Sequence, residues 1–374
     1  MHPSIRSTVT TFAALLLASC ADHSTAPLDV LAKQDKVAPQ ATGSPVVVMS
    51  GLDSPRGLAF GPEGALYVVE AGSTQINGPC VVVARGSNCY SGTGAITRLW
   101  KGRQERIASG LPSYYNRAAS DIGGPQDIDF QGRGNGFVTT GWAANPALRA
   151  GLGANGSSFA AMIRVTPTGD WKIVADPGTH ELLSNPAGGP LDSNPYGVLA
   201  EAGVQYLVDA GGNSLLKVID GVVSTVAIFP STPIAPGSFP GPFVSSEAVP
   251  TEVTRGPDGA LYVSTLSGVP FLPGAARIYR VVEGQAPTVH AAGLTQVTDH
   301  AWGPDGTLYV LQYASAPFFG GPGRIVRIAT NGARTTLPVA LTNPTAIIVG
   351  HDGALYVSNR GNVASVGQVL RITP

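Results

Sequence analysis

The sequence predicts an all-β fold, a six-bladed β-propeller with four-stranded antiparallel blades, from three observations. First, a phrase of eight residues recurs with little change at 61–68, 256–263, 303–310 and 350–357. Second, its aromatic position is also present in two degenerate copies of the phrase. This gives six units, with Tyr67, Phe137, Tyr206, Tyr262, Tyr309 and Tyr356. Third, the last three units are about 47 residues apart, close to the roughly 40 to 50 residues of a four-stranded blade.

Each copy of the phrase predicts a hairpin between the first and second strands of a blade. In Gly-Pro-Asp-Gly at 256–259, proline presets its own φ and glycine accepts a positive φ, which suits a type I turn leading into a strand. The Leu-Tyr-Val that follows consists of strand formers. Third strands are expected where a basic residue alternates with apolar neighbours, at 95–99, 161–165, 214–218, 276–281, 323–328 and 367–372. We interpret the basic residue as a solvated or inter-blade side chain.

The first 43 residues predict export rather than part of the propeller. Residues 1–20 resemble a lipoprotein-type signal peptide, with Arg6 before an apolar run at 12–17 that is too short to span a bilayer. The run ends in Leu-Ala-Ser-Cys, which is similar to the lipobox in which cysteine, here Cys20, becomes lipidated. An ordinary cleaved signal is the alternative. Either way we expect an extracytoplasmic protein, a bacterial cell-envelope lipoprotein or a secreted one, with a flexible tether at 21–43 and the propeller at 44–374.

The two ends of the propeller are expected to pair. After Tyr356 the last unit has room for one further strand, at 368–372, and therefore lacks the outermost strand of a blade. The strand expected at 46–49 can supply it. Such pairing closes the ring of blades and holds both ends of the domain.

Composition restricts the partners. The net charge is −1 and 13% of residues are charged, so no basic surface for nucleic acid or anionic lipid is expected. We expect a monomer that contacts the membrane through its N-terminal lipid alone. Cys80 and Cys89 share one loop and form an even pair once Cys20 is assigned to lipid, which predicts a disulfide in an oxidising compartment.

The functional site is expected on one face. Strands of a blade alternate in direction, so the Gly-Pro-Asp-Gly turns share one face and the other connections share the opposite face. Long segments at 72–94, 141–160, 177–194, 230–249 and 314–322 all belong to the second face. Long loops on a rigid scaffold commonly carry binding sites.

Residues that enter first strands or leave second strands are predicted to line the channel mouth on that face. The candidates for binding are Arg56, Glu70, Asp127, Tyr196, Asp209, Glu252, Asp299, His300 and Asn359. Carboxylates in a narrow mouth repel one another unless a cation compensates, and Ca²⁺ or another hard divalent cation takes oxygen ligands. We therefore assign Asp127, Glu252 and Asp299 as candidate metal ligands.

Two of these candidates have structural alternatives, and no catalytic residue can be named. Asp209 can instead stabilise a turn by bonding nearby backbone N–H groups, and His300 beside Trp302 can be a satisfied core histidine. The sequence contains no nucleophile elbow, HExxH, phosphate-binding glycine loop or CxxC.

The repeat resembles the NHL and gluconolactonase-like group of six-bladed propellers, and Val-Asp-Ala-Gly-Gly-Asn-Ser at 208–214 is similar to the NHL phrase. More narrowly, residues 54–60, the loop with Cys80 and 89–92, and residues 124–128 resemble the ScyD/ScyE family over about 44–374. That resemblance implies a secreted propeller. The family is named for association with scytonemin pigment biosynthesis, which implies no reaction. Gluconolactonase-like enzymes hold a divalent metal with Glu, Asn and Asp, but their local motif is missing here.

Two classes of function follow. One is a non-catalytic module that binds a small molecule or a protein on the loop-rich face. The other is a metal-assisted hydrolase or lactonase with an activated water at the channel mouth. The first is favoured because the acidic ring lacks a general base with a fixed partner, and whether the protein is an enzyme stays open.

Overall fold

The computed structural model describes residues 44–374 except residues 133, 238 and 240. The predicted signal peptide, tether and lipidated Cys20 therefore lie outside the described residues. Within the described part, no helix is long and apolar enough to cross a membrane.

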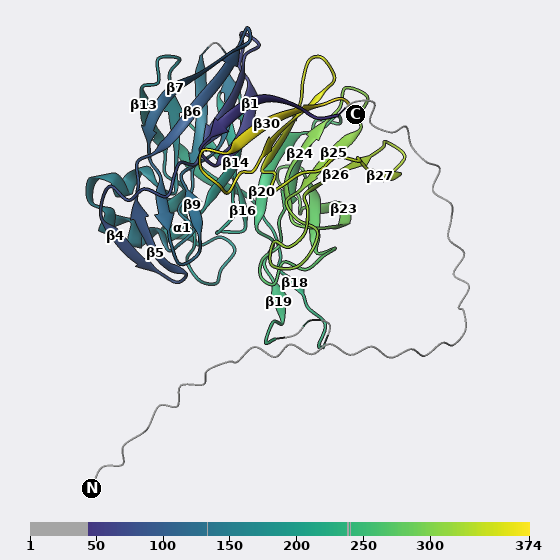
Figure 1. The fold of residues 1–374 in the computed structure, drawn as a ribbon. Helices are drawn as coiled ribbons and strands as arrows, with labels where there is room; N and C mark the ends of the chain where they lie inside the picture. The colour runs from purple at the N-terminus through teal and green to yellow at the C-terminus, as the bar shows by residue number, and fades with distance from the viewer. Residues whose placement is uncertain (1–43, 133, 238, 240) are drawn as a thin grey trace, which may run out of the picture. The chain divides into compact units, whose positions relative to one another are not determined.

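Six four-stranded antiparallel sheets follow one another along the described chain, and we call them blades 1 to 6 (Figure 1). Blades 1 and 2 contain β2 (Pro55–Phe60), β3 (Leu66–Glu70), β6 (Gly94–Trp100) and β7 (Arg103–Leu111), then β10 (Pro125–Gln131), β11 (Asn135–Thr140), β12 (Ala161–Val165) and β13 (Trp171–Ala175). Blades 3 and 4 contain β14 (Pro195–Glu201), β15 (Val204–Asp209), β16 (Ser214–Ile219) and β17 (Val222–Ile228), then β20 (Pro250–Arg255), β21 (Leu261–Thr265), β22 (Ala276–Val281) and β23 (Thr288–Leu294). Blades 5 and 6 contain β24 (Val297–Trp302), β25 (Leu308–Gln312), β26 (Arg324–Ile328) and β27 (Arg334–Thr336), then β28 (Ala346–Val349), β29 (Leu355–Asn359), β30 (Gly367–Ile372) and β1 (Val46–Leu52).

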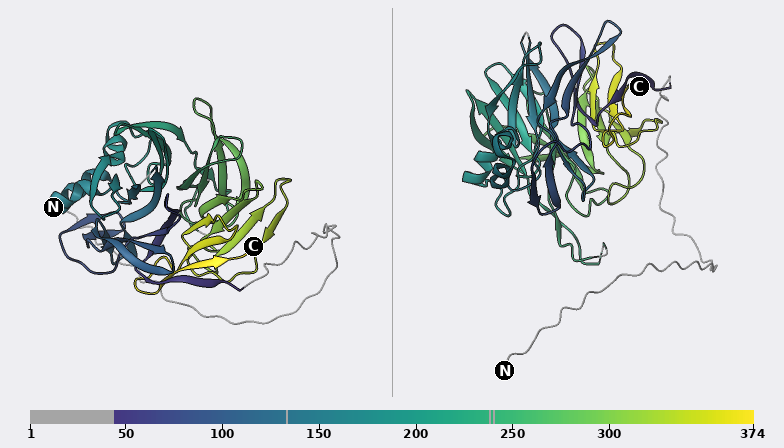
Figure 2. Two further views of the ribbon diagram at one scale, coloured as in Figure 1. Left: turned by 90° about the horizontal axis from the view of Figure 1, so that it is seen from above. Right: turned by 60° about the vertical axis from the view of Figure 1, so that its left-hand side comes forward.

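The first strands of these sheets contact one another in a closed circle, in the order β2, β10, β14, β20, β24, β28 and back to β2. Figure 2 shows the sheets standing around a central axis. The predicted all-β propeller class is therefore confirmed.

The turns between first and second strands form as the repeated phrase predicts. In blade 4, Gly256 N donates to Ala260 O at 2.9 Å, and Gly259 has a φ of +78°. Blade 1 has the same bond between Gly61 N and Ala65 O. We call the end of the propeller that carries these turns the turn face, and the opposite end the loop face.

The N-terminal strand β1 forms the outer strand of blade 6, as predicted. It pairs antiparallel with β30, with Val46 opposite Arg371. Met49 and Leu52 are each 1% exposed and pack in one cluster with Val369 of β30. Closure of the ring therefore combines strand pairing with burial of apolar side chains.

The hydrophobic core lies largely between neighbouring blades. One cluster joins Tyr67, Val69 and Ile96 of blade 1 to Ile128 and Val138 of blade 2, and all five side chains are buried. The recurring aromatic position thus supplies large apolar surface to an interface between sheets.

The loop face carries structured insertions, most of which lie in segments that the sequence predicted as loops. A further four-stranded sheet consists of β4 (Cys80–Val83), β5 (Gly86–Tyr90), β8 (Tyr114–Asn116) and β9 (Asp121–Gly123). The other elements are η1 (Pro146–Ser158), α1 (Pro177–Ser184), β18 (Thr232–Pro233) and β19 (Ser245–Ser246). A disulfide joins Cys80 of β4 to Cys89 of β5, which confirms the predicted pairing.

Candidate functional site

The first strands of the blades enclose a cavity of about 290 Å³. Asp127 of β10, Glu252 of β20 and Asp299 of β24 line it, and each is the third residue of its strand. We call these three residues the channel carboxyl groups. The lining continues to the last residues of β20, β24 and β28, which lead into the turns. The cavity therefore extends from the carboxyl groups toward the turn face.

The cavity lies deeper in the channel than the mouth on the loop face, where the sequence placed the site. Irregularities in the first strands explain this difference. The pairing register shifts between Pro125 and Asp127, and equivalent shifts precede Glu252 and Asp299. A bulge of this kind redirects the following side chain. In each of these three blades it brings a carboxyl group into the channel. Arg56 does not line the cavity.

Asp127 connects three neighbouring blades. Its Oδ2 accepts a hydrogen bond from Val198 N of β14 at 2.8 Å. On the other side lies Gly57 of β2, where a Cβ atom would be 1.9 Å from Asp127 Oδ1. A first strand forms one edge of its sheet and leaves N–H groups without a strand partner. The carboxyl group of Asp127 satisfies one of these donors in the next blade.

Asp299 makes the same kind of contact between blades 5 and 6. Its Oδ2 accepts from Ile347 N of β28 at 2.7 Å, and its Oδ1 accepts from His300 N at 2.5 Å. Asp129 repeats the contact between blades 2 and 3, because its Oδ2 accepts from Ala200 N at 2.7 Å. Acidic side chains thus hold adjacent first strands together.

Burial raises the pKa of every channel carboxyl group. Removal from water is the largest cause for Asp127 and Glu252, and repulsion between the carboxyl groups adds to it, so both pKa values lie well above the usual range. Burial raises the pKa of Asp299 to about 8 against the opposing effect of its backbone donors. Near neutral pH the cluster therefore carries fewer negative charges than it has carboxyl groups.

His300 lines the same cavity as a neutral imidazole. Burial lowers its pKa to about 3. Its Nε2 lies within hydrogen-bond distance of Thr254 Oγ1, at 2.7 Å, and Trp302 Nε1 donates to the same oxygen at 3.2 Å. Its buried Nδ1 has no hydrogen-bond partner among the described residues. His300 is therefore only partly the satisfied core histidine that the sequence allowed.

Arg56 and Tyr196 lie in the wall of the propeller and do not line the cavity. Arg56 is 8% exposed and donates to the carbonyl oxygens of Gly361, after β29, and of Ile122 in β9, the latter at 3.0 Å. It therefore links blade 6 to the insertion sheet. Burial is the main reason that the pKa of Tyr196 rises to about 12. Neither Arg56 nor Tyr196 lines the cavity.

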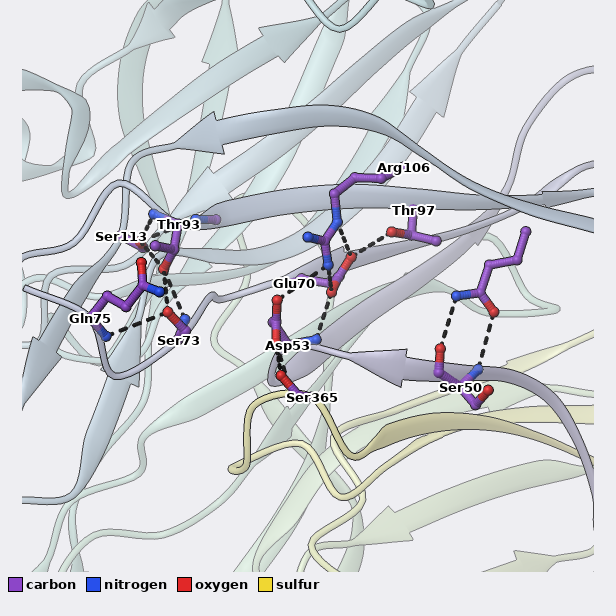
Figure 3. A network of polar contacts seen from close by, with 12 residues as sticks. Ser50, Asp53, Glu70, Ser73, Gln75, Thr93, Thr97, Arg106, Ser113 and Ser365 are labelled. Carbon is purple, nitrogen blue, oxygen red and sulfur yellow. Dashed lines mark hydrogen bonds and ion pairs between the residues drawn. The ribbon is translucent and has the colours of Figure 1, made fainter.

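Glu70 lies in a separate network, drawn in Figure 3. It is fully buried, and it accepts hydrogen bonds from Arg106 Nη2 and from Asp53 N, both at 2.6 Å. Asp53 in turn accepts from Ser365 N at 2.8 Å. The network ties blade 1 to the segment between β29 and β30, which is a structural role.

Asp209 and Asn359 also bind backbone groups outside the cavity lining. Asp209 Oδ1 accepts from Gly211 N at 3.1 Å and Gly212 N at 3.0 Å, which is the turn-stabilising alternative. Asn359 Oδ1 accepts from Thr342 N at 2.8 Å. Of the predicted binding residues, the structure thus brings Asp127, Glu252, Asp299 and His300 together around one cavity.

Sequence reasoning missed further residues with polar groups that line this cavity, namely Asp129, Thr254, Arg255 and Trp302. A signal existed for Asp129, because residues two apart on a strand share a face. Burial raises its pKa to about 6. Thr254 likewise follows Glu252 at a distance of two residues.

Backbone donors occupy part of each channel carboxyl group that was predicted to hold a divalent cation. Oxygen atoms of Asp127, Glu252 and Asp299 accept hydrogen bonds from backbone N–H groups. Among residues 44–374 with the three gaps stated above, no group of three or more His, Cys, Asp or Glu residues is arranged to hold a metal ion. The assignment of these residues as Ca²⁺ ligands stays a prediction.

Comparison with known proteins shows the fold alone. No family model matches this chain, and no curated protein matches it. Among solved structures it is similar to a glucose dehydrogenase, with a TM-score of 0.52 and 15% identity over 89% of this chain and 100% of that one. It is also similar to the soluble aldose sugar dehydrogenase from Escherichia coli, with a TM-score of 0.51 and 14% identity over 88% and 99%. A putative gluconolactonase gives 0.49 and 11% over 89% and 93%.

Proposed function

We propose that this chain is an extracytoplasmic, lipid-anchored β-propeller that binds a small molecule rich in hydrogen-bond donors, such as a polyol or an amine, without transforming it. The ligand occupies the channel cavity and bonds the channel carboxyl groups. One observation carries this proposal: three carboxyl groups from different blades line a single cavity. We also propose that the protein acts as a monomer and without nucleic acid; the low charge supports the second point.

The electrostatics favour such a ligand. Carboxyl groups that are buried and repel one another gain from a molecule that brings O–H or N–H donors or a positive charge. Each hydrogen bond to a charged group contributes about 1.5–3 kcal/mol. The cavity volume of about 290 Å³ is close to the roughly 300 Å³ at the lower end for ligand pockets. A small polar molecule therefore fits better than a polymer.

The contacts of the site favour binding over catalysis. Asp127 and Asp299 each hold a backbone N–H of the next blade, so neither is free to act as a mobile general base. The neutral His300 is paired with Thr254. Among the described residues, no three His, Cys, Asp or Glu side chains are arranged to hold the metal that a lactonase-type mechanism would need. A metal-assisted hydrolase is therefore the weaker alternative.

The disulfide supports the extracytoplasmic part of the proposal. Bonds such as Cys80–Cys89 persist in oxidising compartments and are rare in the cytosol. Lipidation of Cys20 would hold the propeller at the membrane of the cell envelope. The resemblance to the ScyD/ScyE family is consistent with this location.

Calorimetric titration of the purified chain with glucose and with 1,4-diaminobutane at pH 6 and pH 8.5 tests the proposed ligand class. We expect saturable binding of at least one probe, and tighter binding of the diamine at pH 8.5, where the carboxyl groups are more ionised. Asp127→Asn and Glu252→Gln should weaken binding about tenfold or more. Asp305→Asn is the control, because Asp305 lies in a turn and bonds Thr307.

Absence of binding by both probes, or equal affinity in Asp127→Asn and in the wild type, would refute the channel as the site. Turnover of gluconolactone that depends on added Ca²⁺ would favour the hydrolase instead.

A further inference from the structure

A second cavity, of about 350 Å³, lies between blades 1 and 2. Much of its wall is apolar, with Ile96 and Ile107 from blade 1 and Ile128, Phe130 and Val165 from blade 2. These residues belong to the core cluster between the two blades or pack against it. The cavity also borders the turn at Pro62, which places it beside the turn face.

Arg98, Glu63 and Tyr67 form the polar end of this cavity. Tyr67 donates its hydroxyl proton to Glu63 Oε1 at 2.5 Å. The Nη2 of Arg98 is paired with Glu105, and its Nη1 lies 3.8 Å from Glu63. The remaining donor, Arg98 Nε, is buried and has no hydrogen-bond partner among the described residues. A buried donor without a partner is costly.

In two other blades the equivalent arginine Nε has an acceptor in the turn. In blade 4, Arg280 of the third strand donates from Nε to Asp258 of the turn at 2.6 Å. In blade 6, Arg371 donates from Nε to Asp352 at 2.8 Å. Blade 1 has glutamate at the turn position, and this longer side chain does not accept from the arginine Nε. The donor is therefore left for another acceptor.

We propose that the cavity between blades 1 and 2 binds an uncharged, largely apolar small molecule whose carbonyl oxygen accepts a hydrogen bond from Arg98 Nε. The apolar wall takes the body of the molecule. A neutral acceptor is required because Glu63 and Glu105 already surround the arginine, and an anion would be repelled by them. The Arg98 side chain is 24% exposed and lines the cavity.

The test uses the full chain and the fluorescent ketone 6-propionyl-2-(dimethylamino)naphthalene, which is neutral and apolar and carries one carbonyl group. Binding should shift its emission to shorter wavelength in a saturable titration. Arg98→Gln should weaken binding about tenfold or more. Arg280→Gln is the matched control and should leave binding unchanged, because Arg280 Nε already donates a hydrogen bond to Asp258. The parent 2-(dimethylamino)naphthalene, without the carbonyl, should bind wild type and Arg98→Gln within twofold of each other.

A second variant locates the site independently of Arg98. Ile107 lies on the fourth strand of blade 1 and lines the cavity, so Ile107→Trp should fill it and abolish binding of the ketone. Equal binding by Ile107→Trp and wild type, equal binding by Arg98→Gln and wild type, or no saturable binding would overturn the proposal. Glu252→Gln of blade 4, which tests the channel, should not change binding of the ketone, because no residue of blade 4 lines this cavity. The two proposals can therefore fail separately.

Discussion

Two glycines set how closely the channel carboxyl groups approach a neighbouring blade. A Cβ atom at Gly57 would lie 2.6 Å from Asp127 Cα, and one at Gly197 would lie 2.7 Å from Glu252 Cα. Both contacts involve backbone atoms, which cannot move aside as the end of a long side chain can. A side chain at either position would therefore push adjacent first strands apart.

We expect Gly57→Ala to lower the free energy of unfolding by about 1–3 kcal/mol, as overpacking in a tight interior does. Urea denaturation measures this. Gly320→Ala is the milder comparison, because the nearest atom, Pro317 O, would lie 3.2 Å from the new Cβ, against 1.9 Å to the nearest atom at Gly57. Equal stability of the two variants would contradict the close-approach argument.

The channel carboxyl groups predict how stability depends on pH. Burial raises the pKa of Asp299 to about 8 in the folded chain, against roughly 3.9 for an unfolded aspartate. The folded state thus binds more protons between these values. This contribution to stability is complete below about pH 4 and is lost as the pH rises toward 8.

Asp299→Asn should therefore flatten the decline of the unfolding free energy between pH 4.5 and 9, measured by urea denaturation at each pH. The readout is the slope, because the variant also perturbs the bonds to the backbone. Asp305→Asn should keep the wild-type slope, since its bonds to Thr307 lower the pKa of Asp305 and its titration lies at lower pH. A wild-type slope in Asp299→Asn would count against the assignment.

At the scale of elements, local chemistry made the hairpins and the ring closure predictable. Turn residues and strand formers are adjacent in sequence. Counting the strands of the last unit shows that its outer strand is missing. The bulge before Asp127 was not predictable, because it depends on how two strands pair. The insertion sheet was missed for a related reason: β4 joins partners as distant as β8 and β9 into one sheet without any repeated phrase.

We expect the closing strand β1 to be a main contributor to stability. Met49→Ala should cost about 2–5 kcal/mol, as removal of a buried methionine side chain does, because Met49 is 1% exposed. Val46→Ala in the same strand is the control, since Val46 is 55% exposed. Thermal unfolding compares the two. Similar melting temperatures would show that β1 contributes little through its packing.

At the scale of the whole propeller, radial arrangement explains which site residues were predictable. Asp127, Glu252 and Asp299 lie far apart in sequence, yet equivalent positions in three blades bring them to one cavity. Repeat spacing alone was enough to place them near the axis. It did not give the depth of the cavity or the local partners of Glu70, Asp209 and Asn359, because those depend on bulges, loops and individual hydrogen bonds.

The pairing of β1 with β30 also sets how the propeller responds to mechanical force. Val46 lies opposite Arg371, so the first strand begins beside the end of the last one. Antiparallel hydrogen bonds run perpendicular to the strands. A force on residue 44 directed away from β30, across the strands, would break these hydrogen bonds one after another. A force parallel to β1 would load all of them at the same time. A chain held by its N-terminus would therefore withstand tension along that strand far better than tension across it.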